Sequence, residues 1–163
     1  MEYKLVINNE ALWTEEAINF YERHSEEYGF TSEMANSIRD KIKLGEQVRR
    51  VTQFDNADYY SIMSDSDKKV GELKVFKDLE NDEEELIIAI FESHKKIAEK
   101  VIRNFIESYA KAEHVVVAVK ENNRNHCYIK TILTNIGFGP MQHYNNSGYD
   151  FCYVYDRTKS FSN

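Results

Sequence analysis

The chain contains few of the residues that mark cross-linked, metal-binding or multi-domain proteins. Its two cysteines, Cys127 and Cys152, lie apart in the sequence and form neither a disulfide framework nor a metal-binding spacing, so we expect both as thiols. Its five histidines show no short metal-ligand spacing either, and we predict no metal site. With one proline and no low-complexity linker, the sequence gives no sign of a domain boundary. We therefore expect a single domain covering residues 1–163.

Long hydrophobic runs are also missing. No stretch approaches the ~18 consecutive apolar residues of a membrane-spanning helix, and the first four residues lead directly into a strand-like segment rather than a signal peptide. We therefore expect no membrane association, and the cytoplasm is the expected compartment.

The chain lacks an excess of positive charge: it has 21 Lys and Arg residues and 28 Asp and Glu residues, which gives a net charge of −7. Nonspecific binding to nucleic acid depends on clustered Lys and Arg, so we expect no nucleic-acid partner. An acidic protein would suit a cationic acceptor. The same balance also serves solubility alone, so charge by itself selects no substrate.

Aromatic residues, in contrast, are abundant, with 11 Tyr and 9 Phe, and 42% of the residues are hydrophobic. A chain of this length buries roughly two-thirds of the surface that its unfolded form exposes. The composition excludes a disordered chain and predicts one core.

Hydrophobic periodicity predicts alternating strands and helices. The expected strands cover residues 3–7, 59–63, 70–76, 86–91, 114–119, 138–144 and 149–155. Expected helices begin at Thr14 and at Thr31 or Ser32, and two more cover residues 97–109 and 124–135. The helix from Thr31 has apolar residues at helical spacing as far as Val51, which leaves its end open, and the tail 156–163 is expected to be frayed.

Residues 86–119 form the most informative unit. Residues 86–91 and 114–119 are continuous apolar runs, which is typical of strands covered on both faces, and an amphipathic helix lies between them. A strand–helix–strand order favours parallel pairing with a right-handed crossover.

The order of elements resembles that of the Gcn5-related N-acetyltransferase (GNAT) family over essentially the whole chain. The resemblance implies an α/β fold, a single GNAT-like domain with a mixed central sheet of about seven strands flanked by about four helices. It also implies an N-acyltransferase that uses acetyl-CoA as co-substrate and acetylates a primary amine of a small molecule, polyamine or protein. A catalytically inactive GNAT-fold protein that binds a ligand or partner is the alternative.

In that family the fourth strand runs into a glycine-rich turn, (Arg/Gln)-x-x-Gly-x-(Gly/Ala), and the next helix begins at the coenzyme A pyrophosphate, where its amide groups and dipole attract phosphate. Here Lys96 occupies the first glycine position, and Ala98 matches the last. Lys95 and Lys96 could compensate by charge, or the turn could be an ordinary solvated one. The resemblance implies that acetyl-CoA would be bound by Ile90, Phe91, Ser93, His94, Lys95, Lys96, Ile97 and Ala98.

A second family landmark is an Asn after the fifth strand, followed by a Tyr and then by Gly-Phe. Gly137 followed by Phe138 matches the ending, but the usual Tyr position falls on Leu133. Asn125 is the residue that the resemblance offers to the pantetheine arm of the cofactor. Tyr128 is the nearest substitute for the tyrosine that protonates the leaving thiolate, although it points to a different helix face from Leu133.

Near the start of the fourth strand, the family often has a Glu that removes the amine proton. Glu84 and Glu85 lie there, so either is a candidate general base, and a solvated acidic turn is the simpler interpretation. The sequence identifies neither the amine-bearing acceptor nor the oligomeric state, although exposed aromatic strands would permit a homodimer.

Overall fold

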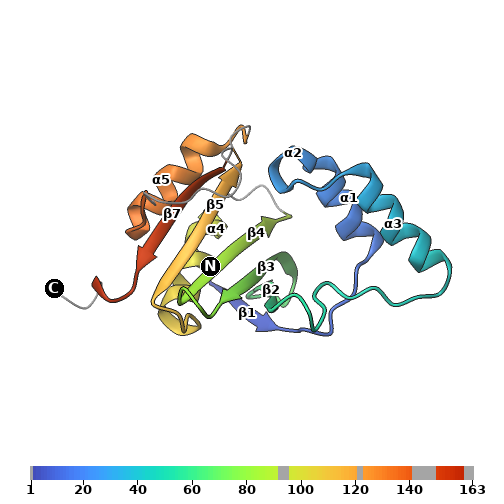
Figure 1. Ribbon diagram of the computed structural model, residues 1–163, viewed down its shortest axis with the longest axis horizontal. Coiled ribbons are helices and arrows are strands. Elements are labelled where there is room, and N and C mark those ends of the chain that lie inside the picture. The colour runs from blue at the N-terminus through green and yellow to red at the C-terminus, as the bar shows by residue number, and fades with distance from the viewer. Residues whose placement is uncertain (1, 92–95, 121–122, 141–149, 160–163) are drawn as a thin grey trace.

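The structure, a computed structural model, describes residues 2–91, 96–120, 123–140 and 150–159. A single seven-stranded sheet forms the centre of the molecule, with helices on both of its faces (Figure 1). The strands are β1 (Tyr3–Ile7), β2 (Ala57–Ser64), β3 (Lys69–Asp78), β4 (Glu83–Ile90), β5 (His114–Lys120), β6 (Gly139–Pro140) and β7 (Asp150–Asp156).

The sheet has the strand order β1-β2-β3-β4-β5-β7-β6. β4 and β5 are parallel, and the other neighbouring strands are antiparallel. The parallel pair is therefore at the centre of a mixed sheet, joined by a helix as the strand–helix–strand pattern predicted.

Five helices lie in the described part of the chain: α1 (Glu15–Arg23), α2 (Ser25–Tyr28), α3 (Ser32–Lys43), α4 (Lys96–Ser108) and α5 (His126–Ile136). Two of them begin at threonine caps, because the side-chain oxygens of Thr14 and Thr31 accept hydrogen bonds from the amides of Ala17 and Met34. α5 ends at Gly137, whose φ of 123° is unfavourable for a residue with a Cβ atom.

The core has two parts, one on each face of the sheet. Strand residues alternate between faces, so the even-numbered residues of β4, such as Leu86, pack with α4 and α5, whereas Ala89 packs with α1. The larger part includes the buried stripe of α4, Ile97, Val101, Ile102 and Phe105. The smaller part is an aromatic cluster between the sheet and the group α1–α3, which lies together on one side in Figure 1.

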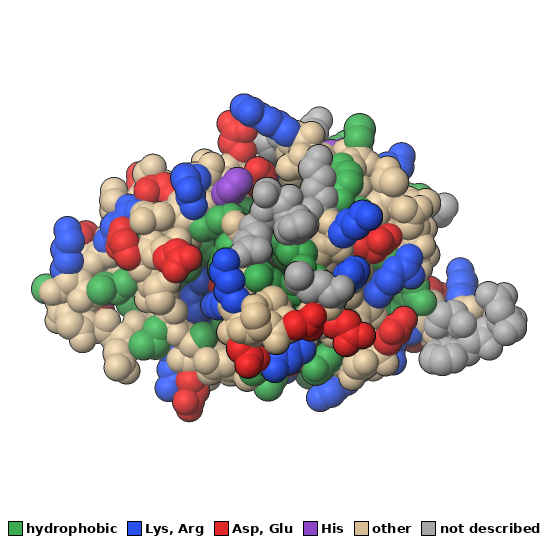
Figure 2. Space-filling model, turned by 180° about the vertical axis from the view of Figure 1, so that it is seen from behind, with side chains coloured by type: hydrophobic (Ala, Val, Ile, Leu, Met, Phe, Trp, Pro, Cys, Tyr) green, Lys and Arg blue, Asp and Glu red, His purple; other side chains and the backbone are tan. Residues whose placement is uncertain are grey.

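On one face of the molecule, hydrophobic side chains reach the surface in the middle, and acidic and basic side chains surround them (Figure 2). Charges of both signs are interspersed there, so the net charge of −7 is not gathered into one patch on this face. Among the described residues, no helix is long and apolar enough to cross a bilayer.

The α/β architecture and the seven-stranded mixed sheet confirm the sequence prediction, and three details correct it. The short helix α2 was not predicted. The helix from Thr31 ends at Lys43 rather than continuing to Val51, which is buried outside any helix. The tail is not frayed from residue 156, because Asp156 ends β7 and Arg157 donates from its amide to the Glu113 carbonyl at 2.9 Å. The predicted hairpin between β6 and β7 is antiparallel as expected, but its turn lies outside the described residues.

Candidate active site between β4 and β5

The two parallel strands of the sheet separate along their length. Residues Glu83 to Leu86 of β4 pair with residues His114 to Val117 of β5. Beyond these residues β4 continues to Ile90 and β5 continues to Lys120, but the two strands no longer pair with each other. Figure 1 shows the two strands diverging toward their carboxyl ends. Main-chain groups on the facing edges beyond Leu86 must therefore find partners outside the sheet.

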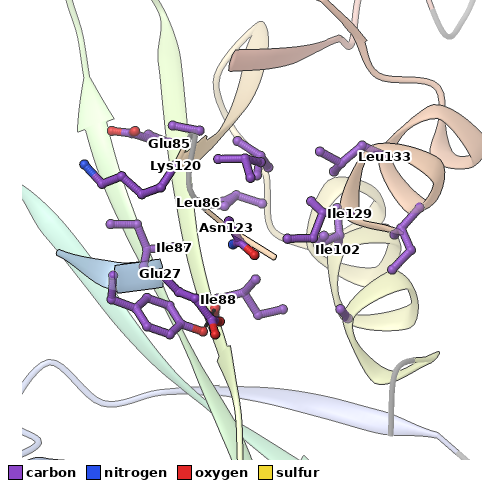
Figure 3. Close-up of a pocket in the computed structure, with 16 residues that line it drawn as sticks. Glu27, Glu85, Leu86, Ile87, Ile88, Ile102, Lys120, Asn123, Ile129 and Leu133 are labelled. Atoms are coloured by element: carbon purple, nitrogen blue, oxygen red, sulfur yellow. Dashed lines mark hydrogen bonds between the residues drawn. The ribbon is translucent and has the colours of Figure 1, made fainter. Parts of the chain in front are cut away.

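A pocket of about 300 Å³ lies at this separation. Figure 3 shows Ile102, Ile129 and Leu133 on one side of it, from α4 and α5, and Glu85, Lys120 and Glu27 on the other. The remaining lining residues are Tyr28, Leu86, Ile87, Ile88, Ala98, Val117, Ala118, Val119, Asn123 and Ile132. The pocket is thus a largely apolar slot with a few polar side chains, as small-molecule sites commonly are.

The exposed edge of β4 points its main-chain groups into this slot. The amide of Phe91 donates to the Val70 carbonyl of β3 at 2.8 Å, so odd-numbered residues of β4 face β3. The amides and carbonyls of Ile88 and Ile90 consequently face the gap.

Tyr28, at the end of α2, uses one of these groups, since its hydroxyl donates to the Ile88 carbonyl at 2.9 Å. Burial, reinforced by the nearby carboxylates of Glu27 and Glu72, raises the pKa of Tyr28 well above its usual value. The hydroxyl therefore stays protonated at neutral pH and is held at the mouth of the gap.

The two candidate bases lie on opposite faces of β4, as neighbouring strand residues must. Glu84 is buried, and its Oε1 accepts from the amides of Lys111 at 2.7 Å and Ala112 at 2.8 Å. This carboxylate fixes the connection between α4 and β5. Glu85, in contrast, lines the pocket.

The predicted phosphate turn is only partly described. Ser93, His94 and Lys95 lie outside the described residues. Lys96 is exposed at the first position of α4, and Ala98 lines the pocket.

The other predicted cofactor residues of this segment have mainly packing contacts. Ile97 is buried in the larger part of the core, and Ile90 packs against that part of the core. Phe91 packs on Phe20 of α1 with 4.9 Å between ring centroids. Of these three, none lines the pocket.

At the other wall, the structure brings a different asparagine to the pocket from the predicted one. Asn125 is exposed before α5 and donates from its amide to the side-chain oxygen of Asn123 at 2.8 Å, and it is Asn123 that lines the pocket. Leu133, which occupies the usual tyrosine position of the family, also lines it. Tyr128 is half-buried on α5 and is not among the lining residues.

Sequence reasoning missed four polar residues of the pocket, Glu27, Tyr28, Lys120 and Asn123. Tyr28 continues the apolar stripe of an amphipathic segment, and Glu27 lies in an acidic segment that resembles solvated surface, so neither stands out as a site residue. Lys120 and Asn123 follow a predicted strand, where side chains at a sheet edge often line a site. That position was the one available signal.

A buried ion pair supports the sheet beside β4. The Arg50 guanidinium pairs with both oxygens of Glu72 on β3, where Glu72 lies opposite Ala89. The Tyr21 hydroxyl donates to Glu72 at 2.5 Å, and Arg50 stacks over Trp13 at 3.8 Å from the ring centroid. Burial raises the pKa of the Tyr21 hydroxyl. The contacts of Glu72 with Tyr21 and Arg50 hold together β3, α1 and the segment before β2.

Comparisons with known proteins extend these observations. No protein-family model matches the sequence, and no curated protein sequence matches it. The spermidine N-acetyltransferase SpeG from Vibrio cholerae, solved with CoA and spermine, aligns with a TM-score of 0.60 and 11% identity over 97% of both chains. A chimera of that enzyme and hSSAT aligns with a TM-score of 0.65 and 11% identity over 100% of both chains.

The N-acetyltransferase PseH from Campylobacter jejuni, solved with acetyl coenzyme A, aligns with a TM-score of 0.56 and 14% identity, over 94% of this chain and 98% of that one. At such low identity the likeness concerns the fold. The chain has the GNAT fold, which confirms the resemblance predicted from the order of its elements.

Proposed function

We propose that this protein is an acetyl-CoA-dependent N-acetyltransferase whose reaction takes place in the slot between β4 and β5. The observation that carries the proposal is the separation of these strands, which leaves an apolar slot beside an unpaired strand edge. An extended chain bearing amide groups can bind such an edge by main-chain hydrogen bonds. The pantetheine arm of acetyl-CoA has this character, and SpeG and PseH were solved with CoA and acetyl coenzyme A respectively.

Acetyl transfer from a thioester to an amine needs a polarised carbonyl, a neutral amine and a proton for the departing thiolate. The main-chain amides of Ile88 and Ile90 face the gap and are suited to polarise the carbonyl. Glu85 is the base that we assign to the amine proton, since it lines the slot whereas Glu84 is occupied by two main-chain amides.

We assign the proton of the thiolate to Tyr28. No hydroxyl is available at Leu133, and Tyr28 is the tyrosine among the described lining residues. Its hydroxyl already lies at the gap, and a rotation away from the Ile88 carbonyl would direct its proton to the sulfur. The amine nitrogen would then form the new amide bond as the carbon–sulfur bond breaks.

The phosphates of the co-substrate are assigned to the start of α4. Lys96 is exposed there, and the positive end of the helix dipole adds to its charge. Lys96 is therefore a residue to reverse in charge, and we pair it with Lys95, its neighbour in the sequence.

Calorimetric titration with acetyl-CoA and CoA tests the proposal directly. We expect saturable binding that weakens at least tenfold in Lys95→Glu/Lys96→Glu. The exposed Lys111 on the α4–β5 connection provides a matched control, and Lys111→Glu should leave the affinity unchanged. No binding at millimolar ligand would overturn the proposal.

The rival function is a GNAT-fold binding module without catalysis, and the apolar Leu133 at the usual tyrosine position is the observation in its favour. A turnover assay over a panel of primary amines distinguishes the two. Binding of acetyl-CoA without acetylation of any amine would favour the module.

A further inference from the structure

A second pocket lies beside the first. It has a volume of about 410 Å³ and is lined by Arg23, His24, Ser25, Glu26, Glu27 and Arg124. Both pockets are lined by Glu27, so the two are neighbours. Arg23 is the last residue of α1, and Arg124 lies between β5 and α5, so the fold alone brings these two arginines to one cavity.

Two arginines and two glutamates line this second pocket, so its formal charges balance. Oε1 of Glu27 lies 3.1 Å from Nδ1 of His24. Neither Arg23 nor Arg124 forms an ion pair with any other residue in the described ranges. Arg39 and Arg50, in contrast, each pair with carboxylates. The two guanidinium groups of this pocket are therefore available to an added anion, although Glu26 and Glu27 line the same cavity.

Guanidinium groups match carboxylate and phosphate in both charge and planar geometry. We infer that the second pocket binds an anionic group of the acceptor, so that the acceptor class is a primary amine that also carries a carboxylate or phosphate. That the acceptor carries a primary amine rests on the proposed function. That it also carries an anionic group rests on the second pocket. With the anion between Arg23 and Arg124, the shared wall at Glu27 places the rest of the molecule next to the slot where the amine would react.

Direct binding tests the second pocket without any turnover. The calorimetric titration uses Lys95→Glu/Lys96→Glu as the background, because these substitutions remove the phosphate site that we assign to the start of α4. Inorganic phosphate should bind this background saturably and should lose at least tenfold in affinity when Arg23→Ala/Arg124→Ala is added. Arg49→Ala in the same background is the matched control, since Arg49 is exposed and lines neither pocket. Binding that survives without the two arginines, or that is absent from the background, overturns the inference.

Kinetics then identify the source of the anion. Ornithine and putrescine, or lysine and cadaverine, differ only in the carboxylate group. We expect Arg23→Ala/Arg124→Ala to raise KM for the carboxylate-bearing amine about tenfold or more and to leave KM for the matched diamine unchanged. An equal change for both members of a pair contradicts an acceptor site.

The co-substrate also carries phosphates, so acetyl-CoA and its 3′-dephospho form provide the second comparison. If Arg23→Ala/Arg124→Ala raises KM for acetyl-CoA but not for the dephospho form, the arginines bind the co-substrate and the assignment to the acceptor is wrong. If no amine is acetylated at all, the proposed function fails, while the phosphate titration still reports on the pocket.

Discussion

The hydroxyl of Tyr28 donates a hydrogen bond of 2.9 Å to the main-chain carbonyl of Ile88, at the point where β4 has separated from β5. In a fully paired sheet that carbonyl would face a neighbouring strand. Here a side chain from α2, 60 positions earlier in the sequence, takes the place of the strand. The bond connects the helical layer to the edge that we assign to the acyl group.

Replacing Tyr28 with Phe should reduce kcat for acetyl transfer by on the order of a hundredfold, because the proposed proton donor for the thiolate is lost. The ring still packs in the aromatic cluster, so the affinity for acetyl-CoA should change little. Steady-state kinetics with calorimetry of acetyl-CoA binding checks both expectations. An unchanged kcat would remove Tyr28 from the mechanism, and Tyr128→Phe serves as the comparison at the residue that the sequence favoured.

Leu133→Tyr should restore part of the activity lost in Tyr28→Phe, because it introduces a hydroxyl on the α5 wall of the slot. Leu133→Phe in the same background is the matched control, since it adds the ring without the hydroxyl. We expect the tyrosine variant to exceed the phenylalanine variant in kcat about tenfold. Equal rates would show that the wall is not near the leaving sulfur.

Glu85 and Glu84 should separate into a catalytic and a structural residue. Glu85→Gln should reduce kcat/KM by on the order of a hundredfold with unchanged stability. Glu84→Gln should retain kcat but lower the free energy of unfolding by about 1.5 kcal/mol, because charged acceptors bind main-chain amides more strongly than neutral ones. Urea denaturation and kinetics on both variants test this, and the reverse pattern would exchange the two roles.

Arg50→Met should lower the free energy of unfolding by roughly 3–5 kcal/mol, since it removes the buried cation of Glu72 and leaves only the partly exposed Lys69, whose Nζ lies 3.6 Å from Oε2 of Glu72. Glu72→Gln added to this variant should recover part of the loss, because the amide still accepts hydrogen bonds from Tyr21 and carries no charge. Urea denaturation of both variants measures the difference. If the second substitution lowers stability further, the ion pair is not the origin of the effect.

Stability should also fall in alkaline solution through buried tyrosines. The pKa of Tyr60 rises from its ordinary value of 10.0 to about 12, mainly through burial and then through the carboxylates of Asp58 and Glu84. The unfolded chain releases this proton near pH 10, whereas the folded protein retains it, so the contribution is complete below pH 10 and is lost progressively up to about pH 12. Urea denaturation across this range checks the slope, which should be shallower in Tyr60→Phe; an identical slope would assign the loss to other groups.

The strand–helix–strand unit was predictable because its signals are local. The apolar run at residues 86–91 and the stripe on α4 express burial through their own periodicity, and Gly137 marks the end of α5 through its backbone conformation. The short helix α2 was not predictable in this way, because four residues hold too little pattern to distinguish a helical turn from a loop.

The candidate site was harder to predict than the fold. Glu84 and Glu85 are adjacent glutamates in an acidic run, and the sequence does not distinguish them. Only the folded sheet shows that Glu84 binds main-chain amides whereas Glu85 lines the pocket. Asn123 and Asn125 present the same difficulty on the other wall. Tyr28 reaches β4 from a distant segment, and single-sequence periodicity has no information about such pairs.

The sequence by itself determined the alternation of strands and helices, the parallel pairing of β4 with β5 and the expectation of acetyl-CoA, because each of these depends on local pattern or on the order of elements. The tertiary structure alone decided that β4 and β5 separate after Leu86, that Tyr28 occupies the freed edge, and that Arg23 and Arg124 share one cavity. The physical reason is that a site forms where main-chain groups and charges from distant segments are left without partners. Pairing between segments is a property of the packed sheet and helices, and no short stretch of the chain contains it.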